Sequence, residues 1–303
     1  MKKVDYEQIA QLHRKYVMHT YPTQSLMLVK GQGSYVWDAN DRRYLDFACG
    51  IAVCNLGHCN PAVSAAIKAQ VDKLVHVSNL YMNENQPQLA EALIKHSFDG
   101  VVFFGNSGAE ANEGMIKFAR KWGHDQGKYE IIAMDDSFHG RTLATLAATG
   151  RAKYRKGFDP DMPGFVHVPF NDLESVKNAI TPQTAAVLLE PVQGEGGVIP
   201  ADAEYINALR KLCDEKNILL LCDEVQCGMG RTGKFFAFQH YGIVPDAVST
   251  AKGIANGVPM GLFIVQRKHE NILEPGMHAS TFGGSPLVSA AALAVIRYID
   301  ENN

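Results

Sequence analysis

Along most of the chain, short apolar runs alternate with stretches in which apolar residues recur every three or four positions. Seven of the runs are typical of strands, and the run from Ile218 to Cys222 is expected to be buried on both faces. The seven runs cover residues 101–104, 130–134, 165–170, 185–190, 218–223, 246–250 and 261–265. Helical spacing lies between most of them. The alternation predicts an α/β fold with a mostly parallel sheet and helices on both faces.

The first part of the chain follows a different pattern. Residues 5–18 have the polar and apolar sides of a short helix, and residues 34–47 are typical of a hairpin with a polar turn at 38–41. A further helix is expected to begin at Pro61, because proline favours the first helical turn. The last apolar segment, from Ser285 onward, predicts another helix.

Composition narrows the classes of function. The 303 residues are 46% hydrophobic and 20% charged, with a net charge of -3, which favours neither nucleic acid nor an anionic membrane surface. No apolar run reaches the ~18 residues of a membrane span, and the N-terminus lacks the apolar core of a secretory signal. We expect a cytoplasmic protein. Its six cysteines have neither zinc nor iron–sulfur spacing, so we expect reduced thiols and no metal.

Two residues near the ends of neighbouring predicted strands suggest a chemical site. Asp223 ends the run 218–223, and Lys252 follows the run 246–250 between two small residues. Ligands bind beyond the carboxyl ends of strands in open parallel sheets, so the two side chains can meet. A desolvated lysine amine is nucleophilic and forms Schiff bases with carbonyls. The pair suits pyridoxal phosphate, which needs a lysine and a carboxylate opposite its pyridine nitrogen. Taken alone, Lys252 is more simply interpreted as a surface lysine, which is several times more common.

The segment after the first predicted sheet strand has the features of a phosphate site. A tight turn, GNSG, leads into a helix near Ala109, and Ser107 with Glu110 fits a capping box. The backbone N–H groups of Ser107, Gly108 and Ala109 would then face an anion at the helix N-terminus. A plain helix cap remains the alternative. No nucleotide-binding glycine motif is present.

Other strand ends carry further candidates. Phe138 can stack on a flat cofactor and Arg141 can bind a carboxylate, although a core phenylalanine and a surface arginine are the simpler interpretations. Glu190 and Glu195 lie at the carboxyl end of another predicted strand, in the glycine-containing segment EPVQGEGG after residues 185–189. Gln226 follows Asp223 closely and suits a hydrogen bond to a phenolate oxygen. Thr281, among small residues, offers a hydroxyl to an anion.

These motifs together resemble one family. NSGAEAN, FHGRT, EPVQGEGG, DEVQCGMGRTG, AKG and STFGG, in this order, are similar to the class III aminotransferases, from about Tyr21 to the end of the chain. Among them the chain most resembles the acetylornithine aminotransferases. The resemblance implies the aspartate aminotransferase-like fold (type I) of pyridoxal-phosphate-dependent transferases and a homodimer with shared active sites.

The resemblance also implies roles for the candidates. Lys252 would carry the cofactor and move the substrate proton, while Asp223 would pair with the pyridine nitrogen and Gln226 with the phenolic oxygen. The phosphate would be bound by Ser107, Gly108 and Ala109, together with Thr281 of the other subunit. The ring would stack on Phe138, and the substrate would be bound by Arg141, Glu195 and Tyr21.

One part of the family pattern has no counterpart here. Glu195 resembles a gating glutamate whose arginine partner belongs to a C-terminal small domain. We therefore expect an N-terminal segment (1–50), a large cofactor-binding domain (51–285) and the start of a helix (286–303) toward a small domain that the sequence does not contain. The chain is then either a fragment or lacks half of this substrate clamp. Cys54 stands where relatives often have asparagine.

The activity predicted from this resemblance is transfer of the δ-amino group of N-acetylornithine to 2-oxoglutarate by a ping-pong mechanism, as in arginine biosynthesis. The alternatives are other ω-amino donors, namely ornithine, 4-aminobutyrate, succinylornithine or an aminoadipate semialdehyde. A non-catalytic, cofactor-binding chain is a further alternative.

Overall fold

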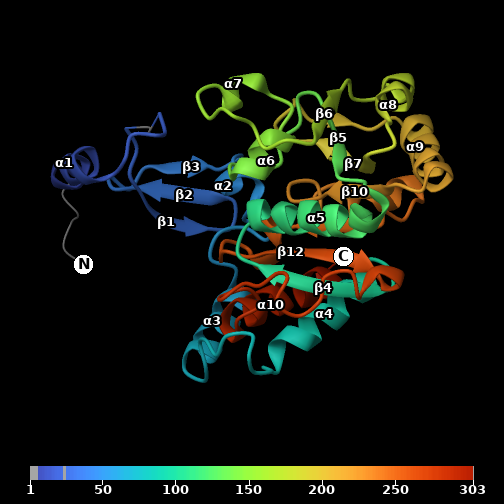
Figure 1. Cartoon of the computed structure of the whole chain (residues 1–303). Helices are drawn as coiled ribbons and strands as arrows, with labels where there is room; N and C mark the ends of the chain where they lie inside the picture. Colours follow the sequence, from blue (N-terminus) through green and yellow to red (C-terminus); the bar gives the residue numbers. More distant parts are fainter. Residues whose placement is uncertain (1–5, 23–24, 303) are drawn as a thin grey trace.

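The computed structural model describes residues 6–22 and 25–302. Its centre is a seven-stranded sheet with the order β4-β12-β11-β10-β7-β5-β6, and Figure 1 shows helices on both of its sides. The strands are β4 (Gly100–Gly105), β5 (Glu130–Met134), β6 (Phe165–Val168), β7 (Thr184–Leu189), β10 (Leu219–Asp223), β11 (Ala247–Thr250) and β12 (Gly261–Gln266). Each agrees with its predicted run to within two residues at either end.

The sheet is mostly parallel, as the sequence predicts. Strands β6, β5, β7, β10 and β11 pair in parallel, while β12 runs antiparallel to both β11 and β4. Alternate residues of the central strands enter different cores. In β7, Ala186 and Leu188 pack on the side of α5 (Gly108–Gly123), whereas Val187 and Leu189 face the opposite core. Burial on both faces explains why these strands are continuous apolar runs.

The helices divide between these two cores. Helix α5 and α6 (Leu143–Ala148) contribute to one core. The other core includes residues of α3 (Pro61–Val71), α4 (Asn85–His96), α8 (Leu173–Ala179), α9 (Ala203–Lys216) and α10 (Pro286–Asn302). No helix in the described part of the chain is long and apolar enough to cross a membrane. The division into three segments stays a prediction.

Shorter elements connect these layers. They are α7 (Ala152–Arg155), the strands β8 (Val192–Gln193) and β9 (Ile199–Pro200), and the 3₁₀ turns η1 (His124–Gln126), η2 (Ala237–Tyr241), η3 (Lys252–Ala255) and η4 (Arg267–His269).

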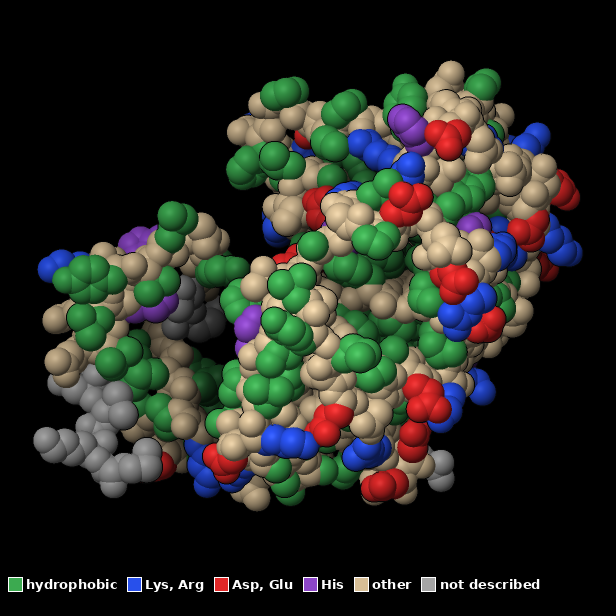
Figure 2. Space-filling model, turned by 60° about the horizontal axis from the view of Figure 1, so that its bottom comes forward, with side chains coloured by type: hydrophobic (Ala, Val, Ile, Leu, Met, Phe, Trp, Pro, Cys, Tyr) green, Lys and Arg blue, Asp and Glu red, His purple; other side chains and the backbone are tan. Residues whose placement is uncertain are grey.

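The N-terminal residues form a lobe beside the main sheet. It consists of α1 (Tyr6–Tyr16) and a three-stranded antiparallel sheet of β1 (Leu28–Gln32), β2 (Tyr35–Asp38) and β3 (Arg43–Leu45). The predicted hairpin is β2–β3, while β1 was not predicted. Helix α1 contains no buried residue, and Figure 2 shows hydrophobic side chains on the surface of this lobe.

A left-handed turn joins the lobe to the rest of the chain. In α2 (Cys49–Ala52) all four residues have positive φ, from 49° at Cys49 to 66° at Gly50. Such a backbone is unfavourable for residues with a Cβ atom. Asp46 stabilises the turn by accepting the N–H groups of Ala48 and Cys49, and its other oxygen lies 2.7 Å from Nε2 of His58. Val53, the next residue, lines the cavity described below.

Candidate active site

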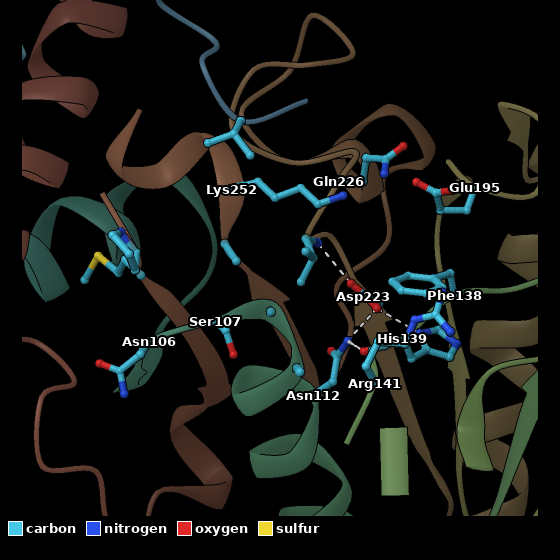
Figure 3. A pocket seen from close by; sticks show the side chains of 18 of the residues that line it. Asn106, Ser107, Asn112, Phe138, His139, Arg141, Glu195, Asp223, Gln226 and Lys252 are labelled. Carbon is cyan, nitrogen blue, oxygen red and sulfur yellow. Dashed lines mark hydrogen bonds and ion pairs between the residues drawn. The ribbon is translucent and has the colours of Figure 1, made fainter. Parts of the chain in front are cut away.

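The sheet brings Lys252 and Asp223 to one cavity of about 430 Å³. Asp223 is the last residue of β10, and the parallel register places it opposite Ser249 of β11. Lys252 begins η3, directly after β11. Figure 3 shows the Lys252 amine and the Gln226 side chain extending into the same space above Asp223.

Lys252 is held in an unusual backbone conformation. Its φ is 47°, in the left-handed region that residues with side chains seldom adopt. Its burial lowers the pKa of the amine, while the negative charges of Asp223 and Glu195 partly oppose this effect. A lowered pKa increases the fraction of neutral, nucleophilic amine at neutral pH.

Asp223 is fixed by donors from three directions. The carboxylate is only 2% exposed. Its Oδ2 accepts hydrogen bonds from Nδ2 of Asn112 at 2.7 Å and from Nδ1 of His139 at 2.8 Å. Its Oδ1 accepts the N–H of Val225 at 3.0 Å. Ser249 donates to Asn112 at 2.7 Å and so completes the network.

These partners were missed from the sequence. Asn112 lies within the NSGAEAN motif and is 1% exposed, so a polar residue among buried positions was the available signal. His139 directly follows Phe138, but nothing in its spacing relates it to Asp223. Among the described residues its Nε2 has no hydrogen-bond partner.

The N-terminus of α5 forms another wall of the cavity. Ser107 is its N-cap and accepts the N–H of Glu110 at 3.1 Å. The predicted capping box is only half present, because the Glu110 carboxylate accepts from the N–H of Asn106 rather than from that of Ser107. Ser107, Gly108 and Ala109 all line the cavity, and first-turn N–H groups have no acceptor within a helix.

Glycines permit the close approach that shapes this wall. A Cβ atom at Gly108 would lie 2.6 Å from a methyl group of Val225, and one at Gly261 would lie 2.0 Å from the carbonyl oxygen of Ser107. A larger residue at Gly108 would displace the Val225 side chain, and one at Gly261 would displace the backbone of Ser107.

The remaining cavity residues come from three loops. Phe138 and Arg141 follow β5, Glu195 follows β8, and Gln226 follows β10. Glu190, only 4% exposed, connects two of these loops, since it accepts the N–H groups of Phe138 at 2.9 Å and Gly194 at 3.1 Å.

Glu190 is also electrostatically unusual. Burial raises the pKa of Glu190 to about 7, with His139 opposing the shift and Asp223 reinforcing it. In the sequence, Glu190 was a candidate only because it lies at the end of a predicted strand.

Two predicted site residues lie outside this cavity in the single chain. Tyr21 is 79% exposed on the N-terminal lobe. Thr281 lines a separate hollow together with Asn79, Met82 and Phe104.

All six cysteines are free thiols, and Cys213, Cys222 and Cys227 are buried. Burial raises the pKa of Cys54, which is half-buried close to Gly257 at the cavity. The described residues contain no group of three or more His, Cys, Asp or Glu arranged to hold a metal ion.

Comparison with known proteins identifies the family to which the chain is similar. The family model of class III aminotransferases matches residues 16–303. An acetylornithine aminotransferase of Caldanaerobacter subterraneus subsp. tengcongensis is 51% identical over 292 residues, which cover 95% of this chain and 74% of that protein.

Solved structures agree. The ornithine aminotransferase of Toxoplasma gondii ME49 has a TM-score of 0.94 at 31% identity, covering 99% of this chain and 73% of that one. An N-acetylornithine aminotransferase of Stenotrophomonas maltophilia K279a has a TM-score of 0.80 at 38% identity, covering 95% and 71%.

The chain belongs to the class III aminotransferases. The family and the fold that the motifs predicted are therefore confirmed.

Proposed function

We propose that this chain transfers the δ-amino group of N-acetylornithine to 2-oxoglutarate, a reaction of arginine biosynthesis in the cytoplasm, with pyridoxal phosphate as cofactor. The observation that carries the proposal is the convergence of Lys252 and Asp223, from neighbouring strands, in one cavity. The choice of donor is supported by relatives named acetylornithine aminotransferase that are about half identical in sequence.

The residues of the cavity fit this cofactor. The N-terminus of α5, kept open by Gly108, would hold the phosphate. Asp223 would pair with the pyridine nitrogen and Gln226 with the phenolic oxygen, while Phe138 would contact the ring face. When bound, the cofactor accepts the electron pair released as a C–H bond next to the substrate nitrogen breaks.

The side chains of the protein then perform the proton transfers. Lys252, whose pKa is lowered by burial, would take the proton from the substrate carbon and deliver it to the cofactor carbon that receives the amino nitrogen. Asp223, oriented by Asn112 and His139, would keep a proton on the pyridine nitrogen. Arg141 would bind a substrate carboxylate, and Glu195 lines the same cavity.

A second copy of the chain is the partner that this proposal requires. Thr281 does not line the cavity of Lys252 in its own chain, and large hydrophobic side chains near it are exposed: Leu80, Met82 and Phe282 are 87%, 98% and 61% exposed. Exposed side chains of this size, together with those on the N-terminal lobe, favour a protein interface. In a homodimer, Thr281 of one subunit would complete the phosphate site of the other.

The test is a panel of amine donors followed by bleaching of the yellow, lysine-bound cofactor. N-acetylornithine should bleach it fastest, ahead of ornithine, succinylornithine and 4-aminobutyrate, and 2-oxoglutarate should restore the colour. A faster reaction with another donor would reassign the substrate, and a bound cofactor that no donor bleaches would favour a non-catalytic chain. Lys252→Ala should abolish the yellow absorbance and turnover while the circular dichroism of the fold is retained; unchanged turnover would remove Lys252 from the mechanism.

A further inference from the structure

Arg141 is held in the cavity wall by aromatic rings rather than by an acid. Its Cζ atom lies 4.0 Å from the ring centroid of Tyr154 and 5.3 Å from that of Phe138. The two rings are almost perpendicular, at 87°, with centroids 6.1 Å apart. No ion pair between described residues involves Arg141, whose side chain is exposed toward the cavity. Its guanidinium is therefore positioned while its N–H donors remain available to a ligand.

The Tyr154 ring is surrounded by further cationic side chains besides Arg141. The charged ends of Lys153 and Arg151 lie 5.0 Å and 5.9 Å from the same ring centroid. Arg151 also donates to the backbone oxygens of Asp136 and Glu195, so the turn carrying Tyr154 is fastened to the loop of Glu195. The ring itself does not line the cavity.

We propose that Tyr154 is a positioning residue for the substrate carboxylate: its ring holds Arg141 in place for carboxylate-bearing substrates without contacting them. A free arginine side chain samples many rotamers, and binding must then restrict them. A guanidinium already held against a ring loses less freedom on binding a planar carboxylate. The inference rests on the proposed function in one respect, namely that the substrate carries a carboxylate for Arg141 to bind.

The first test separates carboxylate recognition from the chemical step. Tyr154→Leu removes the ring, and KM for a carboxylate-bearing donor should rise about two- to five-fold with kcat unchanged. A butylamine donor, which has no carboxylate, should react as it does with the wild type. Tyr154→Phe keeps the ring and should behave as wild type throughout. Equal changes for both donors, or a change in cofactor affinity, would overturn the proposal.

The second test needs no turnover. Binding of glutarate, an unreactive dicarboxylate, is measured by calorimetry on the protein with and without cofactor. Tyr154→Glu offers Arg141 an internal acid that competes with the ligand, so glutarate should bind roughly ten-fold more weakly. Lys153→Gln makes the same change of one unit charge beside the ring and should leave the affinity within about two-fold.

The glutarate titration also distinguishes this proposal from the choice of amino donor. If N-acetylornithine proves not to be the donor, glutarate still reports on Tyr154 and Arg141. Equal affinities for wild type and Tyr154→Glu, or equal losses in Tyr154→Glu and Lys153→Gln, would show that Tyr154 does not control carboxylate binding.

Discussion

Glu224 directly follows Asp223, yet its side chain lies in the core and is not among the groups that line the cavity. Its two oxygens accept the N–H groups of Ala237 at 2.6 Å and Phe238 at 2.7 Å, where η2 begins. Burial raises the pKa of Glu224 to about 8, even though these two N–H groups act to lower it. The folded protein therefore keeps this carboxyl largely protonated at neutral pH.

We predict that Glu224→Gln removes a pH-dependent loss of stability. In the unfolded chain this carboxyl has a pKa near 4.5, so between that pH and about 8 the folded state binds a proton that the unfolded state has released. Because the unfolded state binds fewer protons, the free energy of unfolding falls as the pH rises through this range. From pH 5 to pH 8 the fall due to Glu224 amounts to about 3 to 4 kcal/mol.

Urea denaturation at pH 5, 6, 7 and 8 measures this difference. The amide does not titrate, but its NH2 group cannot accept one of the two N–H groups, which costs the variant the same stability at every pH. The stability of the variant relative to the wild type should therefore rise progressively from pH 5 toward pH 8. Glu190 titrates in the same direction but is present in both proteins, so it cancels in the comparison. The control Glu215→Gln changes an exposed glutamate and should give a curve parallel to the wild type. A parallel curve for Glu224→Gln as well would refute the argument from burial.

Three further substitutions test the site and its support. Asp223→Asn should retain the cofactor but lose kcat by ~100-fold, since an amide cannot hold the pyridine proton in place; single-turnover rates near wild type would contradict this. Gly108→Ala brings a Cβ atom to 2.6 Å from a valine methyl group, and equilibrium dialysis should show cofactor binding weakened by about ten-fold. Burial alone would raise the pKa of Asp246, but hydrogen bonds and charges from His269 and Arg210 hold that pKa below its usual value of 3.8. Asp246→Asn should therefore lower the free energy of unfolding by about 3 kcal/mol at pH 7. The stabilisation by ionised Asp246 is lost as the pH falls below the pKa of this residue in the unfolded chain, so the unfolding free energies of variant and wild type should converge in acid. A difference that stays constant with pH would count against the ion pairs.

The central sheet could be predicted because its inner strands are buried on both faces and are therefore continuous apolar runs. Strand β1 was missed because Lys30 and Gly31 interrupt its apolar pattern and nearly all of it is exposed. The left-handed turn at α2 has no sequence signal apart from Gly50, since positive φ is unfavourable for Cys49, Ile51 and Ala52 and is maintained by the tertiary structure.

The candidate site was predictable to the extent that its residues follow strands. Phe138, Asp223 and Lys252 lie at or just beyond strand ends, where the fold class places ligands. The groups that orient them were not predictable, because Asn112 contributes from a helix and Tyr154 from a short turn. Their contacts with the site depend on the folded packing and leave no periodic signal in the chain.

The pairing of β10 with β11 also limits which parts of the site can be altered by changes in sequence. A shift of one residue between them would turn Asp223 and Ser249 to opposite faces of the sheet, so the relative placement of the two strand ends cannot vary by small steps. Arg141 and Glu195 lie on loops, which tolerate replacement and changes of length. New amine specificities are therefore most accessible through these loops, on a pair of strands that stays unchanged.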